Sequence, residues 1–260
     1  MSESGRRVEG CLFDLDGTVY QEGRAILGAA EALEALRRRG LPFRFTTNTT
    51  RRPRAALAER LREMGIPAHA EEILSAPVAA SHWLRSRGVR RVQLLLAEAT
   101  FEEFAGFEIT NRSPEVVVVG DLGEGWTFPL LNQAFRNLMD GAELLAIQRN
   151  RYWHTDGGLS LDAGPFVAAL EHGSGKTATL VGKPSPAFFE AAARELGVPS
   201  ERIAVVGDDL ESDVAGARAA GMIGVAVRTG KYRPQDEERA RQAADAVLDS
   251  IAEMPGWIGD

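Results

Sequence analysis

Short apolar runs alternate with longer segments of helical periodicity along almost the whole chain of 260 residues. Strands that are apolar at nearly every position are typical of parallel sheets, because helices cover both faces of such sheets. The alternation of the two patterns therefore predicts an α/β fold with parallel sheets and helices on both faces. The expected strands are residues 10–13, 42–46, 92–96, 116–119, 143–147, 179–182, 203–206, 223–227 and 246–248.

Two of the helical segments also carry residues that favour helix ends. Residues 53–64 begin with proline and are followed by Gly65, whereas residues 186–196 follow Ser185, begin with proline and are followed by Gly197. Serine caps free backbone N–H groups, proline fits the first helical position, and glycine adopts the left-handed conformation that ends a helix. These residues predict two helices with those boundaries.

A β-hairpin is expected in the middle of the chain. Asp156, Gly157 and Gly158 separate two strand-like segments, residues 152–154 and 159–161. Glycine tolerates the positive φ that tight hairpin turns require. The spacing therefore predicts a short turn between two antiparallel strands.

The composition indicates a globular protein that binds neither nucleic acid nor a membrane. The net charge is −7 and the pI is near 5.3, whereas surfaces that bind nucleic acid need an excess of clustered basic residues. No apolar run approaches the ~20 residues that cross a bilayer, and the polar residues 1–9 lack the features of a secretion signal. Cys11, the single cysteine, excludes an intrachain disulfide and is expected to be buried. These features favour a cytoplasmic protein.

Candidate chemistry begins at the end of the first predicted strand. The apolar residues 11–13 run directly into Asp14, Leu15, Asp16 and Gly17. Residues at the carboxyl ends of parallel strands face the crevice in which α/β proteins bind ligands. Two nearby carboxylates repel each other unless a proton or a cation joins them, and either arrangement prepares an active site. The alternative is a loop that merely turns on the Asp-Gly pair.

A second acidic group follows another apolar strand, residues 203–206. Gly207 is followed by Asp208, Asp209 and, four residues later, Asp213. Mg²⁺ prefers oxygen ligands and takes one or two of them from protein carboxylates, so acids at a strand end suit it. The alternative is structural, with Asp213 as the N-cap of a helix over residues 214–220 and Asp209 as an ordinary loop residue.

Two further elements can bind phosphate. The second predicted strand ends in the run Thr46, Thr47, Asn48, Thr49 and Thr50, whose hydroxyl and backbone N–H groups can bind phosphate oxygens, although such a run is also an ordinary capping loop. Lys183 lies between a predicted strand and a predicted helix, where its ammonium can neutralise phosphate charge, although a lone surface lysine is the simpler interpretation.

These four elements, in this order, resemble the motifs of the haloacid dehalogenase superfamily of phosphohydrolases. The family motifs are a DxDG[TV] strand end, a Ser/Thr strand end, a lysine and a second acidic strand end. They correspond here to residues 14–18, to Thr47 with Asn48, to Lys183, and to Gly207-Asp208 with Asp213. The resemblance covers the chain from about residue 10 to residue 230.

The resemblance also implies a domain organisation, because the wide gap between Thr47 and Lys183 is where one subgroup of the family carries a large α/β cap. We therefore expect a Rossmann-like catalytic core at residues 1–76 and 183–260, and an inserted α/β cap that determines substrate specificity at residues 77–182. Residues 158–165 resemble the branch that contains phospholysine phosphohistidine inorganic pyrophosphate phosphatase and its uncharacterised relatives.

Matching each motif to the family assigns roles to single residues. Asp14 would attack phosphorus to give an aspartyl-phosphate, and Asp16 would act as general acid and then general base. Mg²⁺ would be held by Asp14, the backbone carbonyl of Asp16 and Asp208, with Asp213 acting mainly through hydrogen bonds to those ligands. The phosphoryl oxygens would be stabilised by Thr47 and Lys183 and by the amides around Leu15 and Asn48.

The implied function is Mg²⁺-dependent hydrolysis of a small phosphorylated metabolite, which is a phosphomonoester, pyrophosphate or a compound with a P–N bond. Two alternatives remain open on the same scaffold: a catalytically silent sugar-phosphate-binding or regulatory protein, and a phosphotransferase or mutase. A helical cap of the kind found in mutases does not fit the short stretch between the first two motifs. The sequence does not fix the oligomeric state and leaves a homodimer open.

Four other features have less specific interpretations. Asp121 after residues 116–119 imitates Asp208, but we expect it to be a strand end of the cap rather than a second metal site. Residues 173–177 resemble a Walker phosphate loop, but Leu170 stands where that motif requires glycine.

Asp162 is either the N-cap of a helix over residues 166–172 or a cap-loop residue that selects the leaving group. The aromatic residues Trp126, Trp153 and Phe128 could line a substrate pocket, but we expect them to pack in the core of the cap.

Overall fold

A computed structural model describes residues 7–155 and 157–259, and the chain divides into two compact units. The first unit contains the chain up to Thr47, Arg54–Leu74, and the chain from Lys183 onward. The second unit contains Asn48–Pro53 and Ser75–Gly182. The second unit is therefore inserted into the first, and it also includes the short segment that directly follows Thr47.

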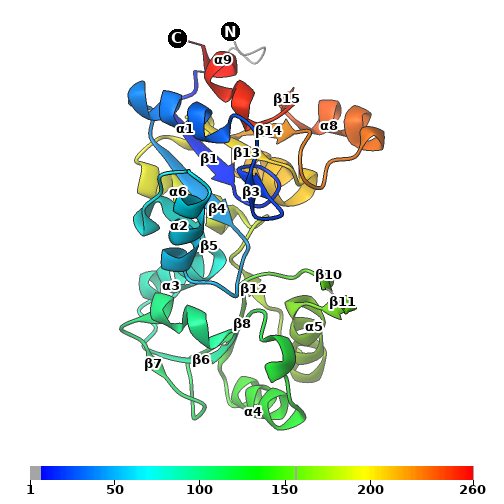
Figure 1. Cartoon of the computed structure of the whole chain (residues 1–260). Coiled ribbons are helices and arrows are strands. Elements are labelled where there is room, and N and C mark those ends of the chain that lie inside the picture. The colour runs from blue at the N-terminus through cyan, green and yellow to red at the C-terminus, as the bar shows by residue number, and fades with distance from the viewer. Residues whose placement is uncertain (1–6, 156, 260) are drawn as a thin grey trace. The chain divides into compact units, whose positions relative to one another are not determined.

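The first unit is built on a six-stranded sheet with the order β15-β14-β13-β1-β4-β5 (Figure 1). The pairs formed by β1 with β4 and β13, and by β14 with β13 and β15, are all parallel. The first of these strands is apolar because both of its faces are covered, and its residues Cys11, Leu12 and Phe13 are fully buried. The bounds are β1 (Gly10–Asp14), β4 (Phe43–Thr47), β5 (Ile73–Ser75), β13 (Ile203–Gly207), β14 (Ile223–Val227) and β15 (Ala246–Leu248).

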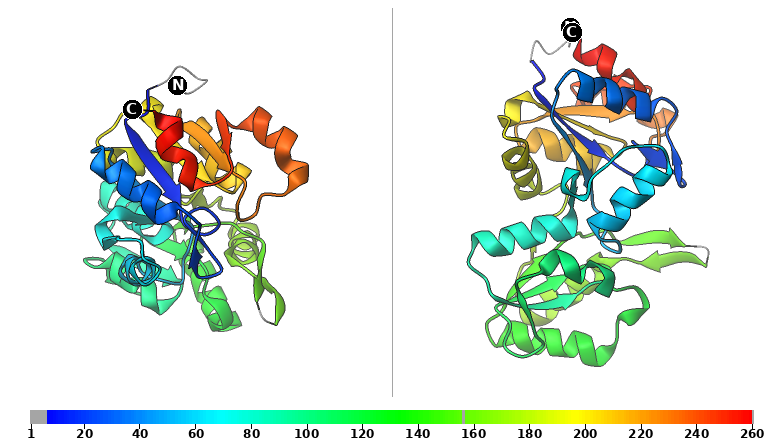
Figure 2. Two further views of the ribbon diagram at one scale, coloured as in Figure 1. Left: turned by 45° about the horizontal axis from the view of Figure 1, so that its top comes forward. Right: turned by 60° about the vertical axis from the view of Figure 1, so that its left-hand side comes forward.

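Helices cover both faces of this sheet, as the views in Figure 2 show. Side chains of α1 and α2, such as Leu33 and Leu57, pack with Phe13 in one apolar core. Val214 and Ala240 form a cluster with Ala226 of β14. The helices are α1 (Ala29–Arg38), α2 (Arg54–Glu63), α6 (Pro186–Leu196), α7 (Gly216–Ala219), α8 (Glu237–Ala243) and α9 (Met254–Ile258), and a small hairpin is formed by β2 (Tyr20–Gln21) and β3 (Arg24–Ala25).

The second unit has its own sheet, with the order β12-β9-β8-β6-β7 and parallel pairing throughout. Ala80 of α3 packs on one face of this sheet, and Leu138 of α4 and Val167 of α5 pack on the other. Its elements are α3 (Ala76–Ser86), β6 (Arg91–Leu95), β7 (Glu108–Ile109), β8 (Val116–Val119), α4 (Phe128–Met139), β9 (Glu143–Ala146), α5 (Ala163–Ser174) and β12 (Thr179–Leu180). Together the two sheets confirm the predicted α/β class with an inserted α/β unit.

The antiparallel hairpin expected in the middle of the chain belongs to the second unit. Strands β10 (Tyr152–Thr155) and β11 (Gly158–Leu161) pair as predicted, with Thr155 opposite Gly158. Asp156, the first residue of the predicted turn, lies outside the described residues, as do residues 1–6 of the polar N-terminal segment. In Figure 2 the two strands extend away from the rest of the second unit.

Several local predictions can be compared with the structure directly. The helices expected at residues 53–64 and 186–196 are confirmed as α2 and α6. Ser185 stands at the N-cap position of α6, as predicted, although its side chain accepts no capping hydrogen bond. Cys11 is buried and free, as expected. Within the described ranges, no helix has both the length and the apolar character needed to cross a bilayer.

The helix expected at residues 214–220 begins earlier than the sequence pattern indicated. Residues Leu210–Ala215 form a π-helical segment that continues into α7. Its N-cap is Asp209, whose carboxylate accepts hydrogen bonds from the backbone N–H groups of Glu211 and Ser212, each at 3.0 Å. Asp213 lies inside the segment and not at its N-cap, so the structural alternative suggested by the sequence for Asp213 is wrong. The carboxylate of Asp213 therefore does not cap this helix.

Candidate active site

The acidic residues singled out in the sequence meet at the carboxyl edge of the sheet in the first unit. Strands β1 and β13 are neighbours in parallel register, so Asp14 at the end of β1 and Asp208 just after β13 reach the same edge. Asp213 joins them from the π-helical segment. Each of these three buried carboxylates offers one oxygen atom that lies within 4.8 Å of the oxygen atoms offered by the other two.

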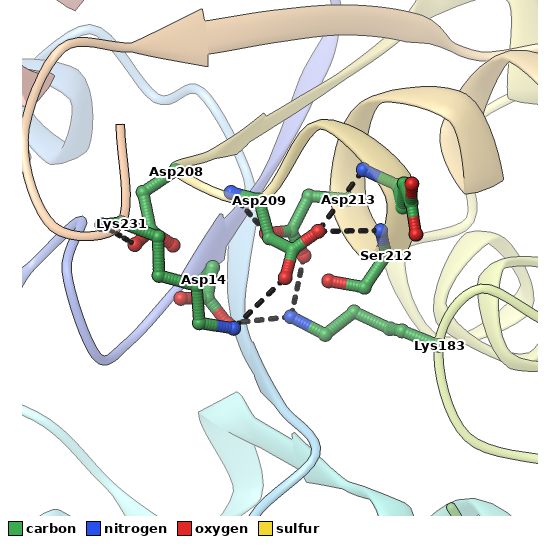
Figure 3. A network of polar contacts seen from close by, with 8 residues as sticks. Asp14, Lys183, Asp208, Asp209, Ser212, Asp213 and Lys231 are labelled. Atoms are coloured by element: carbon green, nitrogen blue, oxygen red, sulfur yellow. Dashed lines mark hydrogen bonds and ion pairs between the residues drawn. The ribbon is translucent and has the colours of Figure 1, made fainter. Parts of the chain in front are cut away.

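Lys183 lies inside this acidic cluster and links two of its members. Its Nζ donates to Oδ1 of Asp14 at 2.5 Å and to Oδ1 of Asp213 at 2.6 Å (Figure 3). Only 2% of the lysine side chain is exposed. A buried ammonium needs such partners, because an isolated charge in a protein interior is very costly. The lysine predicted to neutralise phosphate charge therefore neutralises carboxylates in the structure itself.

Burial shapes the protonation of the cluster. It raises the pKa of Asp14 to about 6, although the ammonium of Lys183 acts in the opposite direction. Burial likewise raises the pKa of Asp208 to about 6 and that of Asp213 to about 7. For Lys183, burial lowers the pKa, but the charges of Asp14 and Asp213 prevail and raise it, so the lysine stays protonated. Lys183 pairs with Asp14 and Asp213, and Lys231, which is bonded to Asp209, also lowers the pKa values of Asp14 and Asp208. Acidic groups therefore still outnumber ammonium groups at the site.

This donor set fits a hard divalent cation. Mg²⁺ prefers oxygen ligands and usually takes one or two protein carboxylates, with water and phosphate oxygens as its other ligands. Asp14 and Asp208 can supply those carboxylates, because each offers an oxygen atom to the cluster. Asp213 is less suited to bind the cation directly, because its Oδ1 is bonded to Lys183 and its Oδ2 accepts from the backbone N–H of Asp209 at 3.3 Å.

The remaining residues of the first motif surround Asp14. Leu15 is fully buried, and its carbonyl oxygen accepts from the backbone N–H groups of Val19 and Tyr20 at 2.9 and 3.1 Å. The side chain of Asp16 is exposed to solvent, so its carboxylate can exchange protons with a bound molecule. Thr18 is buried, and its hydroxyl has no hydrogen-bond partner among the described residues.

Thr47 and Asn48, which the sequence pairs in one motif, fall in different units. Thr47 ends β4 next to β1, where Thr46 lies opposite Asp14 in the parallel register, and it is buried. Asn48 belongs to the second unit, where Gly182 approaches it closely. A Cβ at Gly182 would stand 2.9 Å from Oδ1 of Asn48, so glycine allows this close packing. The phosphate-binding roles predicted for both residues stay predictions.

Asp162 stands at the N-cap of α5, one of the two positions expected for it. Its Oδ1 accepts from the backbone N–H of Ala163 at 2.7 Å and from Nε2 of Gln148. Gln148 in turn accepts from the backbone N–H of Asn150 at 2.7 Å. Each of these contacts lies within the second unit. They support the capping role, whereas the leaving-group selector role stays a prediction.

The structure also tests the predictions made for residues 173–177 and for the aromatic residues of the second unit. Residues 173–177 begin inside the last turn of helix α5 and do not follow a strand, in agreement with the argument against a Walker loop. Trp126 packs by stacking on Phe166 with ring centroids 4.0 Å apart. Phe128, by contrast, is 78% exposed, so the expectation that it packs in a core is wrong. The side chain of Trp153 is not among the parts of the chain that the structure describes.

Sequence reasoning missed one segment of the site. Thr229, Gly230 and Lys231 follow β14 and contact both acidic strand ends. Lys231 also pairs with Asp209, with Nζ 2.8 Å from Oδ2. Burial raises the pKa of Asp209, but the bonds from Lys231 and Ser212 outweigh it and bring that pKa down to about 2. The signal that could have found this segment is its position after a predicted strand, residues 223–227, because such ends converge on one edge.

Comparison with known proteins finds similar sequences that cover almost the whole chain. Residues 11–110 match the family model of haloacid dehalogenase-like hydrolases, and residues 180–254 match a second model described as HAD-hydrolase-like. Human haloacid dehalogenase-like hydrolase domain-containing protein 2 is 42% identical over 90% of this chain and 89% of its own. Bovine phospholysine phosphohistidine inorganic pyrophosphate phosphatase is 39% identical over 95% of this chain and 92% of its own.

A solved structure shares the fold over almost the whole chain. The crystal structure of 4-nitrophenylphosphatase from Thermotoga maritima is 30% identical, covers 96% of this chain and 97% of its own, and superposes with a TM-score of 0.88. These matches confirm the resemblance to phosphatases of the haloacid dehalogenase superfamily that the motifs predicted. The chain therefore belongs to the haloacid dehalogenase-like hydrolases.

Proposed function

We propose that this hydrolase is a Mg²⁺-dependent phosphatase that hydrolyses a small phosphorylated metabolite through a transient aspartyl-phosphate on Asp14. The observation that carries the proposal is the cluster of Asp14, Asp208 and Asp213 around the buried ammonium of Lys183. Such a cluster combines a nucleophile, oxygen ligands for a cation and a fixed positive charge within one site. The names of the similar phosphatases support the reaction class.

The first half of the reaction forms a bond between Asp14 and phosphorus. A carboxylate oxygen of Asp14 attacks the phosphorus atom, and the bond between phosphorus and the leaving oxygen breaks. Asp16 gives its proton to that leaving oxygen, for which its exposed position suits it. Lys183 keeps its charge throughout and can stabilise both Asp14 and the phosphoryl oxygens, with Thr47 as a further donor.

The second half releases phosphate. Asp16, now a carboxylate, takes a proton from a water molecule as that water attacks phosphorus, and the bond between phosphorus and Asp14 breaks. The products are inorganic phosphate and the original Asp14 carboxylate, with the proton back on Asp16. Each catalytic residue therefore returns to its starting state after one turnover.

The residues proposed to hold Mg²⁺ are Asp14, the backbone carbonyl of Asp16 and Asp208, with Asp213 as a support for Lys183. When bound there, Mg²⁺ supplies positive charge that offsets the repulsion between the carboxylate nucleophile and the phosphoryl group. The larger Ca²⁺ takes more oxygen ligands and tolerates bidentate carboxylates, so it would occupy both oxygens of Asp14 and inhibit.

The proposal is tested with p-nitrophenyl phosphate as substrate. We expect turnover with Mg²⁺, loss of turnover in excess EDTA, recovery when Mg²⁺ is added back, and inhibition by Ca²⁺. Full turnover in EDTA, with metal loss verified by elemental analysis, would contradict the proposed cofactor. No turnover with any phosphorylated compound would favour the silent binding protein instead.

The physiological substrate is a narrower question. Because a similar protein is named for phospholysine, phosphohistidine and pyrophosphate, the screen should include pyrophosphate and imidodiphosphate beside phosphorylated metabolites. Release of free phosphate, as opposed to its transfer to a second metabolite or to another position of the same one, separates a phosphatase from a phosphotransferase or mutase. Gel filtration of the same preparation would test for a homodimer.

A further inference from the structure

The turn formed by Thr229, Gly230 and Lys231 lies against the candidate metal site of the first unit. It follows β14, which is the neighbour of β13 in the sheet, and so it reaches the edge at which Asp208 stands. Figure 3 shows Lys231 beside Asp208 and Asp209. None of the motifs identified in the sequence includes these three residues.

The turn fixes one oxygen of Asp208. The backbone N–H of Lys231 donates to Oδ2 of Asp208 at 2.7 Å. A carboxylate held by a backbone donor has a defined orientation, and the bond occupies only one of its two oxygens. Oδ1 can then coordinate a cation in a direction set by the fold. Because the donor is a backbone group, this contact leaves no signature in the identity of residue 231.

Two glycines allow the turn to come this close. Gly17 and Gly230 both have positive φ angles, +93° and +63°. A Cβ on Gly230 would stand 2.6 Å from the Cα of Gly17 and would overlap with Oδ2 of Asp208, and a Cβ on Gly17 would overlap with the same oxygen. The carboxylate of Asp208 therefore lies against two backbones that only glycine permits at this separation.

The turn also holds the first motif. The hydroxyl of Thr229 donates to the carbonyl oxygen of Gly17 at 2.5 Å. On the other side of that residue, the backbone N–H of Gly17 donates to the carbonyl of Tyr20 at 2.7 Å. These two bonds fix the peptide groups on both sides of Gly17. Thr229 holds the group after Gly17, whereas the group before Gly17, which carries the carbonyl oxygen of Asp16, is bonded to Tyr20.

We propose that Thr229, Gly230 and Lys231 position the metal ligands before the cation binds, by orienting the carboxylate of Asp208 and by holding the peptide group next to the one that carries the backbone carbonyl of Asp16. This inference rests on the proposed Mg²⁺ dependence. Hydrogen bonds to metal ligands orient them, and losing one such bond typically weakens metal affinity about 10–100-fold. The three residues are positioning residues, because they act through Asp208 and the first motif.

The hydroxyl of Thr229 gives the first test. Thr229→Val keeps the shape of the side chain but removes its hydrogen bond to Gly17, whereas Thr229→Ser keeps the hydroxyl. We expect the dissociation constant for Mg²⁺, measured by calorimetric titration of the metal-free protein, to rise about tenfold in Thr229→Val and to stay within threefold in Thr229→Ser. Equal affinities in Thr229→Val and the wild type would overturn the positioning role, and so would an equal loss in both variants.

Gly230 gives the second test, with Gly221 as a matched control. Both residues have positive φ, +63° and +77°, so alanine strains the backbone at either position. A Cβ at Gly221 meets nothing within 4 Å, whereas one at Gly230 displaces the carboxylate of Asp208. We expect Gly230→Ala to weaken Mg²⁺ binding at least tenfold and Gly221→Ala to weaken it less than threefold. Similar affinities in the two variants would contradict the proposal.

Melting temperatures in EDTA separate positioning from folding. Gly221→Ala reports how much stability the strained backbone alone costs, and Thr229→Val should melt within a few degrees of the wild type. If the wild-type protein binds no Mg²⁺, the proposed cofactor and this inference both fail. If the wild type binds Mg²⁺ and the variants bind it equally well, only the inference fails.

Discussion

Two strand ends in this chain have the same sequence and different chemistry. Val205, Val206, Gly207 and Asp208 end β13 in the first unit, and Val118, Val119, Gly120 and Asp121 end β8 in the second. Both aspartates are buried and both follow a central parallel strand. By local pattern alone, either could be a metal ligand.

Their partners distinguish them. Asp121 pairs with the guanidinium of Arg51, whose Nε lies 2.5 Å from Oδ2, and its Oδ1 accepts from the backbone N–H of Gly123 at 2.8 Å. Asp208 accepts from one backbone N–H, and burial raises its pKa to about 6, with the charge of Asp213 adding to the rise. A carboxylate already neutralised by a guanidinium stabilises its own unit, whereas one with excess negative charge around it can bind a cation.

The largest expected effect concerns the nucleophile. Asp14→Asn and Asp16→Asn should each lower kcat at least ~10³-fold, because each change removes several kcal/mol of transition-state stabilisation. The fold should persist, and Asp14→Asn should melt within a few degrees of the wild type, since burial already disfavours the Asp14 charge. Steady-state rates and thermal melts provide the measurement. More than a tenth of wild-type activity in Asp14→Asn would exclude the covalent mechanism.

The comparison itself is tested by making the same change at both strand ends. Asp208→Asn should weaken Mg²⁺ affinity at least about tenfold, because it replaces a ligand in a site held by hydrogen bonds. Asp121→Asn should leave that affinity within threefold but lower the melting temperature by roughly 2–4 °C, since Arg51 loses a partner worth about 1 kcal/mol. Calorimetric titration and melting curves measure both quantities. Equal losses of Mg²⁺ affinity would erase the distinction between the two sites.

The three buried acids of the first unit predict that stability depends on pH with the opposite sign to that of an ordinary ion-paired acid. An acid whose pKa is higher in the folded state contributes stability at low pH, and that contribution is lost as pH rises through the folded pKa. Burial raises the pKa values of Asp14 and Asp208 to about 6 and the pKa of Asp213 to about 7. The metal-free protein should therefore lose this contribution as the pH rises from about 4 to about 7.

Mg²⁺ should compensate for that loss, because the cation binds the ionised acids. The rise in melting temperature on adding Mg²⁺ should be larger at pH 8 than at pH 5, and Asp208→Asn should reduce the difference. Melting curves with and without the cation at both pH values decide this. A Mg²⁺ effect that is equal at both pH values would show that these acids are not the ligands.

The smallest expected effect is at Asp162 of the second unit. If it caps α5, Asp162→Ala costs about 0.5–2 kcal/mol of stability and changes all substrates alike. Its hydrogen bonds to Ala163 and Gln148 make this the expected result. If it selects the leaving group, the melt stays nearly unchanged, p-nitrophenyl phosphate is spared, and kcat/KM for the best metabolite falls at least tenfold, or about 1.4 kcal/mol. Melts and rates for both substrates distinguish the two roles.

The sequence by itself determined most of the architecture and the set of acids at the strand ends. Buried parallel strands need apolar residues at nearly every position, so β1, β8 and β13 were visible without any knowledge of their partners. The order of the motifs also indicated the family. In addition, Asp14, Lys183 and Asp208 stand in segments whose local pattern places them at strand ends or before a helix, where ligands bind.

Only the tertiary structure decided which of the charged residues form ion pairs with one another. Lys183 meets Asp14 and Asp213, and Arg51 meets Asp121, across long stretches of sequence that no local pattern spans. The N-cap at Asp209 could not be read from the sequence, because a π-helical segment begins earlier than apolar periodicity suggests. The position of residues 229–231 after a predicted strand was a signal in the sequence, but their contact with Asp208 was not, since it is made by the backbone N–H of Lys231, a group that every residue except proline possesses.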